Sequence, residues 1–172
     1  MDNIFLVIGP SGAGKSKTVD KLNLPDNFVV RHLDKVICNH NNESRISQYL
    51  NRIQNPAFFH KSVNSIRKLK DEFPDKKLII DIGAGSIDYT DCLDFYSNFF
   101  KIYLHADKEI LYNRILQKNP DETRDLKEYL ASEYSPHRIK LYASANFTVD
   151  NSKLTIEQTA NALEKIIFNA SK

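Results

Sequence analysis

A glycine-rich segment near the N-terminus has the composition and spacing of a phosphate-binding loop. Residues 9–16, GPSGAGKS, fit the pattern G-x-x-x-x-G-K-[ST], known as Walker A. Glycines let backbone N–H groups curve around a phosphate, and the helix that follows adds its N-terminal dipole. In this pattern the lysine reaches the β- and γ-phosphates and the last hydroxyl binds Mg²⁺. We therefore expect a nucleotide to contact Gly9, Ser11, Gly12, Ala13, Gly14, Lys15, Ser16 and Lys17. The alternative is a flexible glycine loop that only caps a helix.

Two aspartates lie where short apolar segments end, which suggests catalytic or metal-binding carboxylates. Asp34 follows the segment 28–30, and Asp81 lies near the end of the segment 78–82. Asp34 can accept the proton of a substrate hydroxyl or orient that hydroxyl. Otherwise it caps a helix beginning at Lys35. Asp81, with Ser16, can hold Mg²⁺ directly or through water. Its alternative is an aspartate satisfied by neighbouring backbone amides.

The order of apolar segments along the chain predicts the scaffold that must hold these groups. Continuously apolar strands are expected at residues 4–8, 28–30, 78–82, 99–104 and 147–149. Helical spacing or capping signals predict helices at 15–22, within 34–73, from a cap at Thr90 to about 98, at 108–117 after Asp107, at 138–145 and at 155–168. Strands without polar alternation are buried on both faces. We therefore expect an α/β sandwich with a largely parallel sheet, in which the loops after Ile8, Val30, Ile82 and Leu104 line the site.

Composition restricts the class of protein. The chain has 172 residues, a net charge of +2 and two cysteines, Cys38 and Cys92. This length favours one domain, spanning 1–172, and the small net charge is unusual for a dedicated nucleic-acid or membrane-surface binder. Two cysteines are too few for a disulfide scaffold, so we expect buried thiols in a reducing cytosol. No segment has the roughly 20 apolar residues of a membrane helix, and we expect a cytoplasmic protein.

With these motifs in order, the sequence resembles the shikimate kinase family of P-loop small-molecule kinases over almost its whole length. The similar segments are IFLVIGPSGAGKS, LDKVI, Gly83-Ala84-Gly85 after LIID, KIYLHADKEILYNRI, Arg124-Asp125-Leu126, and Arg138-x-x-x-Tyr142-x-x-Ala145 followed by FTVD. The resemblance implies a P-loop NTPase three-layer sandwich with a five-stranded parallel sheet, a substrate-binding helical region at about 34–73 and a mobile lid at about 119–136. It also implies MgATP as the phosphoryl donor and a hydroxyl of a small polar acid as the acceptor.

The resemblance also suggests roles for individual residues. Lys15, Asp34 and Arg124 are expected to be catalytic, with Arg124 neutralising charge on the transferring phosphoryl group from the lid. Arg114 is expected near the nucleotide base, and Arg138 can clamp a carboxylate with its planar guanidinium. Each arginine has the alternative of a solvated surface charge. The substrate is expected to contact Asp34, His60, Gly83, Ala84, Gly85 and Arg138.

The departures from the family pattern fall at the expected substrate pocket. His32 replaces the first aspartate of Asp-x-Asp, His60 replaces the arginine of a Phe-Arg pair, and Ala84 replaces the middle of three glycines. The nucleotide side keeps its pattern. The expected protein is therefore an ATP-dependent small-molecule kinase, a monomer that binds no nucleic acid and no membrane. The alternatives are an ATP-binding module without kinase activity and a gluconate- or nucleotide-type kinase.

Overall fold

A single parallel sheet forms the centre of the protein. The structure, a computed structural model, describes residues 3–53, 55–89 and 92–171. The described residues form a five-stranded sheet in the order β2-β3-β1-β4-β5, with every neighbouring pair parallel. The strands are β1 (Ile4–Ile8), β2 (Phe28–His32), β3 (Lys77–Asp81), β4 (Phe100–His105) and β5 (Phe147–Asp150). The expected parallel α/β sheet is confirmed.

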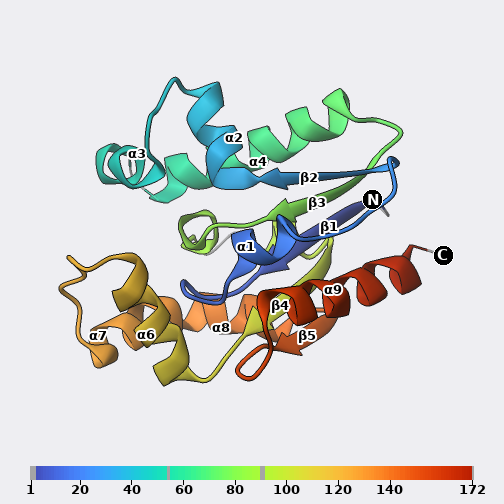
Figure 1. Cartoon of the computed structure of the whole chain (residues 1–172). Coiled ribbons are helices and arrows are strands. Elements are labelled where there is room, and N and C mark those ends of the chain that lie inside the picture. The colour runs from blue at the N-terminus through green and yellow to red at the C-terminus, as the bar shows by residue number, and fades with distance from the viewer. Residues whose placement is uncertain (1–2, 54, 90–91, 172) are drawn as a thin grey trace.

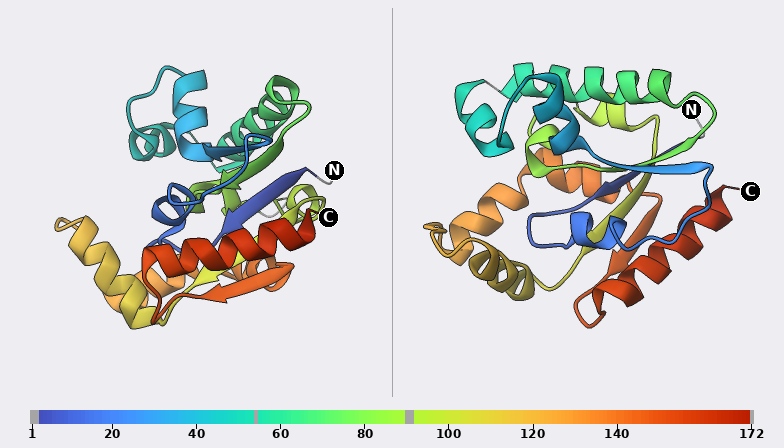
Figure 2. Two further views of the ribbon diagram at one scale, coloured as in Figure 1. Left: turned by 45° about the vertical axis from the view of Figure 1, so that its right-hand side comes forward. Right: turned by 45° about the horizontal axis from the view of Figure 1, so that its top comes forward.

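Helices cover both faces of the sheet (Figures 1 and 2). They are α1 (Lys15–Val19), α2 (Leu33–His40), α3 (Ile46–Arg52), α4 (Asn55–Glu72), α5 (Cys92–Tyr96), α6 (Lys108–Lys118), α7 (Leu126–Glu133), α8 (Pro136–Ala143) and α9 (Ile156–Ala170), with a 3₁₀ turn η1 (Ala84–Ile87). Figure 2 shows α4 on one side of the sheet and α9 on the other, which gives three layers.

Two apolar clusters, one on each face, hold these layers together. On one face Leu6 and Ile80 pack with Phe58 of α4 and Tyr96 of α5. On the other face Val7 and Ile102 pack with Leu111, Tyr129, Leu163 and Ile167. Because alternate residues of a strand point to opposite faces, continuously apolar strands supply both clusters. Both cysteines, Cys38 and Cys92, are buried as expected.

The strand order locates the site. The chain passes from β1 to β2 and β3 on one side, and then to β4 and β5 on the other. In open α/β sheets, ligands bind beyond the carboxyl ends of the strands at such a reversal, which here falls after β1. The glycine-rich loop follows β1 at this point. In Figure 1 it lies with α1 between the helices α2–α4 and the helices α6–α8.

Several sequence-based boundaries shift in the structure. Helix α1 ends at Val19, whereas the pattern predicts a helix to residue 22. Strand β2 extends to His32, beyond the expected 28–30, and β4 is shifted by one residue from the expected 99–104. Thr90, expected as a cap, lies outside the described residues. Asp107 occupies the N-cap position of α6, but its side chain makes no capping hydrogen bond. No described helix has the length and apolarity needed to cross a membrane.

The polar segment 119–136 contains a packed helix that the sequence pattern did not predict. Helix α7 begins with a capping box between Asp125 and Glu128. Tyr129 and Glu133 are buried on one side of this helix, and the Tyr129 hydroxyl donates a 2.6 Å hydrogen bond to the carbonyl of Ser11. The expected lid segment is therefore docked on the phosphate loop in this structure. Its expected mobility stays a prediction.

A capping box at the start of α9 gives a test of the sequence-to-structure link. The Thr155 hydroxyl accepts from the backbone N–H of Gln158, whose side chain accepts from the N–H of Thr155. Thr155→Ala removes one of these bonds, so we expect the free energy of unfolding to fall by about 1 kcal/mol. Urea denaturation measures this change. Thr123→Ala, at an exposed position outside the helices, is the control, and an equal loss in both variants would contradict the capping role.

Candidate active site

The phosphate loop is folded in a conformation that requires glycine. Gly12 has φ of 85°, and a Cβ there would lie 2.5 Å from the carbonyl oxygen of Leu111. The Lys15 ammonium donates to the carbonyl oxygens of Gly9 at 2.8 Å and Pro10 at 3.1 Å, which folds the side chain back over the loop. Burial lowers the pKa of Lys15, while the nearby charges of Asp81, Glu133 and Asp34 oppose that shift.

The buried Asn151, which the sequence pattern did not predict as a site residue, holds the phosphate loop through a hydrogen bond to its backbone. The Asn151 amide donates to the carbonyl of Ala13 at 2.8 Å, and its side-chain oxygen accepts from Arg114 at 3.1 Å. Arg114 also donates to the Asn151 carbonyl and approaches the carbonyl of Gly12. The structure therefore brings Arg114 beside the phosphate loop, and its contact with a nucleotide base stays a prediction. The one sequence signal for Asn151 was its position directly after the last predicted strand.

Ser16, Asp81 and His32 form a hydrogen-bonded cluster at the carboxyl edge of the sheet. The Ser16 hydroxyl donates to Asp81 Oδ2 at 2.5 Å, and His32 Nδ1 lies 3.1 Å from the same oxygen. His32 and Asp81 are register partners on β2 and β3, which explains their proximity. The other ring nitrogen, Nε2, lies 2.8 Å from Asp20 Oδ1. The described partners of Asp81 are therefore side chains, and the alternative that neighbouring backbone amides satisfy this carboxylate is wrong.

Proton affinities in this cluster follow from its charges. The hydrogen bond to Asp81 is the main cause that raises the pKa of His32, and the contact with Asp20 adds to it. An imidazolium can donate from both nitrogens, as two carboxylate partners require. Burial alone would raise the pKa of Asp81, but His32, Lys15 and Ser16 hold it below its usual value. Asp81 is thus ionised and His32 favours its cationic form.

Ser16 and Asp81 also fit a Mg²⁺ ion. Asp81 Oδ1 is buried and has no hydrogen-bond partner among the described residues. Carboxylate and hydroxyl oxygens are the hard donors that Mg²⁺ prefers, and the ion usually takes few protein ligands together with phosphates and water. No cluster of three or more His, Cys, Asp or Glu side chains suited to a metal occurs among the described residues. A site shared by two residues and a nucleotide is consistent with that finding.

Asp34 lies against the glycine that follows β3. A Cβ added to Gly83 would lie 2.2 Å from Asp34 Oδ1, so the carboxylate occupies the space that a side chain would need. Asp34 sits inside the first turn of α2, which begins at Leu33, and the alternative of an N-cap is wrong. Burial and the charge of Asp81 raise the pKa of Asp34 to about 6, although Lys15 and His32 oppose the shift. Such a carboxylate suits proton transfer near neutral pH.

A buried glutamate that the sequence pattern did not predict connects the lid segment to the phosphate loop. Glu133 is 3% exposed. Its carboxylate accepts from the Ser11 N–H at 2.9 Å and from the Ser11 hydroxyl at 3.0 Å. Its place one turn after Tyr129, on the buried side of α7, was the one available signal. A charged residue on an apolar helix face needs a partner, and here Ser11 and Arg138 provide it.

Arg138 is engaged by acidic side chains and is not open to solvent. Its guanidinium donates to Asp88 through Nε at 2.6 Å and through Nη2 at 2.5 Å, and to Glu133 through Nη1 at 2.8 Å. The alternative of a solvated arginine is wrong, because the residue is 5% exposed. In this structure Asp88 accepts from the pair of parallel donors, Nε and Nη2, that a substrate carboxylate would need. A contact with substrate stays a prediction.

The remaining predicted residues are less closely assembled. Arg124 pairs with Glu122 inside the lid segment and donates to Ser132 at 2.9 Å. Its hydrogen bond lowers the pKa of Glu122 to about 2. His60 is exposed on α4, with its ring 6.0 Å from that of Phe59. These arrangements do not test the catalytic role predicted for Arg124 or the substrate contact predicted for His60. The side chain of Lys17 is exposed, and its contact with a nucleotide also stays a prediction. Ala84 begins η1, and a Cβ on Gly85 would crowd Leu50.

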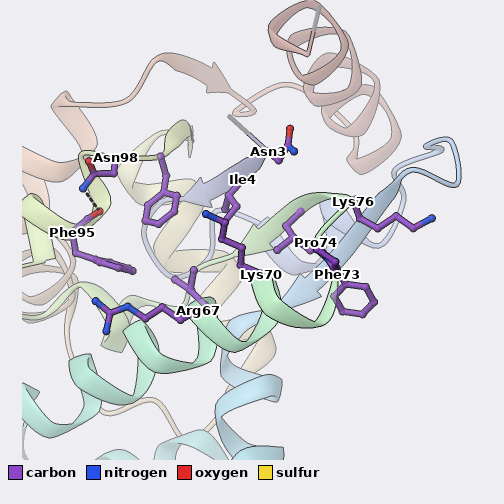
Figure 3. A pocket seen from close by; sticks show the side chains of 12 residues that line it. Asn3, Ile4, Arg67, Lys70, Phe73, Pro74, Lys76, Phe95 and Asn98 are labelled. Atoms are coloured by element: carbon purple, nitrogen blue, oxygen red, sulfur yellow. Dashed lines mark hydrogen bonds between the residues drawn. The ribbon is translucent and has the colours of Figure 1, made fainter. Parts of the chain in front are cut away.

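A cavity of about 590 Å³ lies at the opposite end of the sheet from these groups. Its lining includes Ile4 and Leu78, the first residues of β1 and β3 or close to them. Figure 3 shows Arg67 and Lys70 extending from α4 beside Phe95 and Ile4. Because the phosphate loop and Asp81 lie at the other ends of the same strands, this cavity is separate from the candidate active site.

The sheet order, the loop after β1 and the carboxylates around it define an α/β P-loop protein of the small-molecule kinase type. A family model described as shikimate kinase matches residues 11–167. That match spans most of the chain, and the protein therefore belongs to the shikimate kinase family. No curated protein matches the sequence significantly.

Solved structures agree with this assignment at the level of the fold. The shikimate kinase from Acinetobacter baumannii in complex with shikimate has a TM-score of 0.76 and 20% identity, covering 97% of this chain and 93% of that one. The shikimate kinase from Aquifex aeolicus has a TM-score of 0.71 and 20% identity, and the match covers 97% of this chain and 98% of that one. The shikimate kinase from Bacteroides thetaiotaomicron has a TM-score of 0.69 and 18% identity, and the match covers 96% of this chain and 98% of that one. Family and fold together support a small-molecule kinase.

The His32 cluster predicts a pH-dependent stability difference. A histidine whose pKa is raised in the folded state stabilises the protein below its unfolded pKa, and this stabilisation is lost as pH rises through the folded pKa. His32→Gln should therefore destabilise the protein most below about pH 6.5, and the difference from the wild type should shrink at higher pH. Urea unfolding from pH 5.5 to 9 measures it. His60→Gln, at an exposed position, is the control, and a constant His32→Gln effect would contradict the ion-pair interpretation.

Proposed function

We propose that the protein transfers the γ-phosphoryl group of ATP to a hydroxyl of a small polar metabolite. The observation that carries this proposal is the convergence of Lys15, Asp34 and the Ser16–Asp81 pair at the carboxyl end of β1. The charges of Asp34 and Asp81 both act on Lys15. A phosphate-binding lysine, a candidate base and a metal-binding pair are the parts that phosphoryl transfer requires.

The transfer step assigns a role to each group. The acceptor oxygen bonds to the γ-phosphorus while the bond from that phosphorus to the β–γ bridging oxygen breaks, and ADP leaves with the electron pair. Asp34 orients the acceptor hydroxyl and takes its proton. Lys15 and the loop amides bind the phosphates and stabilise the charge that develops on them. Mg²⁺, held by Ser16 and Asp81, would neutralise charge on the β- and γ-phosphate oxygens.

The lid segment supplies protection from water. Water would compete with the acceptor hydroxyl for the phosphoryl group, so an enclosed site favours transfer over hydrolysis. Tyr129 and Glu133 hold α7 against Ser11 of the phosphate loop. Arg124 lies at the start of the same segment, from which closure around a nucleotide would bring its guanidinium toward the phosphates. We propose Arg124 as a stabiliser of the transferring group on this basis.

A second candidate is an ATP-binding module that regulates a partner and does not transfer phosphate. The capture of Arg138 by Asp88 favours it, because a substrate-binding group of the family pattern is occupied. A nucleotide- or gluconate-type kinase keeps the proposed chemistry and changes the acceptor. ATP binding without turnover on any hydroxylated compound distinguishes the module from both kinases. A cytoplasmic monomer remains the expected state of the protein.

The phosphate-loop lysine gives the first test of this function. ATP binds the native state, so it should raise the melting temperature of the wild type with increasing concentration. Lys15→Ala should lose most of that shift, because the variant lacks the cation that contacts the phosphates. Differential scanning fluorimetry with MgATP measures the effect. Lys165→Ala, at an exposed position on α9, is the matched control. An equal ATP shift in the two variants would contradict the phosphate-loop assignment.

Asp34 predicts the pH profile of the reaction. A base must be ionised to accept a proton, and the pKa of Asp34 is raised to about 6. The kcat/KM for phosphoryl transfer should therefore rise through about pH 6 and level off above it. Asp34→Asn should lower kcat by roughly 10²- to 10⁴-fold and remove this limb. Steady-state rates with an acceptor found by screening hydroxylated compounds provide the test, and an unchanged limb in the variant would exclude Asp34 as the base.

A further inference from the structure

We propose that the cavity at the amino ends of β1 and β3 is a second ligand site, which takes a small organic anion with an apolar body, such as an aromatic carboxylate or sulfonate. This site goes beyond the proposed kinase function and does not depend on it, because the cavity lies at the opposite end of the sheet from Lys15 and Asp81. The proposal is carried by the apolar lining of the cavity and by two cations that extend over it.

The cavity has the size and the lining of a small-molecule site. Its volume of about 590 Å³ falls within the range of roughly 300–1,000 Å³ that is usual for such sites. Its lining includes the buried apolar side chains of Ile4, Ile66, Leu78 and Phe99. The rings of Phe73 and Phe95, which are partly exposed, add aromatic surface. An apolar ring that binds here would leave water and contact these side chains, which favours association.

Two cations of α4 line this cavity and are available to a ligand. Arg67 and Lys70 are three residues apart and therefore neighbours on the helix surface. Figure 3 shows Lys70 extending toward Ile4 and Arg67 lying beside Phe95. Within residues 3–53, 55–89 and 92–171, neither cation has an ion pair or a hydrogen-bond partner. Their charges are therefore free to bind an anion.

The other charged groups of the lining are also basic. Lys76 lines the cavity, but its ammonium donates to the backbone carbonyl of Asp26 at 2.8 Å, and Figure 3 shows its side chain extending away from Lys70. Arg31 lies with its guanidinium carbon 4.7 Å from the centre of the Phe73 ring. Among the described residues, the lining contains no aspartate or glutamate. An anion in the cavity would therefore meet opposite charges and no like charge in that lining.

The acids closest in sequence to the lining do not occupy the cavity. Exposed acids that are not part of the lining are Asp26, Asp71, Glu72, Asp75 and Asp94. Asp71 lines a neighbouring cavity of about 270 Å³, which Arg67 shares with the basic residues His40, Lys61 and Lys68. The described residues show no ion pair between Asp71 and Arg67. Asp2, next to Asn3 in the sequence, lies outside the described residues.

An anion with an apolar body matches both features of the cavity. Its acidic group can accept hydrogen bonds from the Arg67 guanidinium and the Lys70 ammonium, and bonds between ionised groups are stronger than neutral ones. A neutral compound of the same shape gains only the contact with apolar surface. An anion without an apolar body gains only the ion pairs, which contribute little at exposed side chains such as these. Arg67 and Lys70 therefore determine the preference for an anion.

The test compares two fluorescent probes that differ in one acidic group. The anionic probe is anilinonaphthalene sulfonate, and the neutral probe is phenylnaphthylamine, which lacks only the sulfonate. We expect saturable binding of the anionic probe to the wild type, and Arg67→Gln/Lys70→Gln should raise its Kd by about ten-fold. The Kd of the neutral probe should change by less than about two-fold, because the apolar lining is intact. Lys61→Gln/Lys68→Gln is the matched control, since it removes two cations from the same helix but only from the smaller cavity.

Two further measurements locate the bound probe. Saturating MgADP should leave the anionic probe bound, because the candidate nucleotide site lies at the other end of the sheet. The melting temperatures of both double variants should stay close to that of the wild type, because all four substituted side chains are exposed. Probe binding without any phosphoryl transfer would support this inference and count against the kinase function alone. The inference is overturned if the anionic probe does not saturate, if MgADP displaces it, or if the two double variants weaken its binding equally.

Discussion

The need to compensate buried carboxylates organises the candidate active site. Asp34, Asp81 and Glu133 all lie at or near the phosphate loop and are largely buried, and burial disfavours the charged forms of Asp34 and Asp81. Lys15 acts on all three, His32 holds Asp81, and Arg138 holds Glu133. Because a buried charge without a partner costs far more than a paired one, these positions depend on one another. Loss of the charge of Lys15 or His32 would therefore raise the pKa of both Asp34 and Asp81.

The same pairings connect the phosphate loop to the lid segment. Ser11 bonds Glu133 and Tyr129 of α7, Glu133 bonds Arg138 of α8, and Arg138 bonds Asp88 after η1. This chain of contacts runs from the nucleotide side of the site to the acceptor side. A movement of α7 would therefore disturb the contacts of both Ser11 and Arg138, because Glu133 bonds both residues.

The departures from the family pattern are compensated unevenly. His32 takes the place of an aspartate, yet it sits between Asp81 and Asp20 and leaves Asp81 Oδ1 available beside Ser16. Ser16 and Asp81 therefore present the oxygen donors that a Mg²⁺ ion on the nucleotide side would need. On the acceptor side, His60 is exposed and Arg138 is paired with Asp88, so the groups that would recognise a carboxylate are lost or occupied. The sequence departures from the family pattern therefore lie on the proposed acceptor side, while the glycine-rich loop keeps its pattern.

The sequence by itself determined the elements whose signals are local. The glycine spacing of residues 9–16 specified the phosphate loop, continuously apolar runs specified the parallel strands, and Thr155 with Gln158 specified the start of α9, because neighbouring residues decide backbone conformation and capping. The partners of Asp81, Glu133 and Arg138 came only from the tertiary structure. Helix α7 was missed because it lies in a long polar segment and its buried face includes Glu133, which is stabilised by Ser11, 122 residues away in the sequence. Ion pairs form between side chains that are distant in the sequence, so neither composition nor spacing predicts which acid pairs with a given arginine.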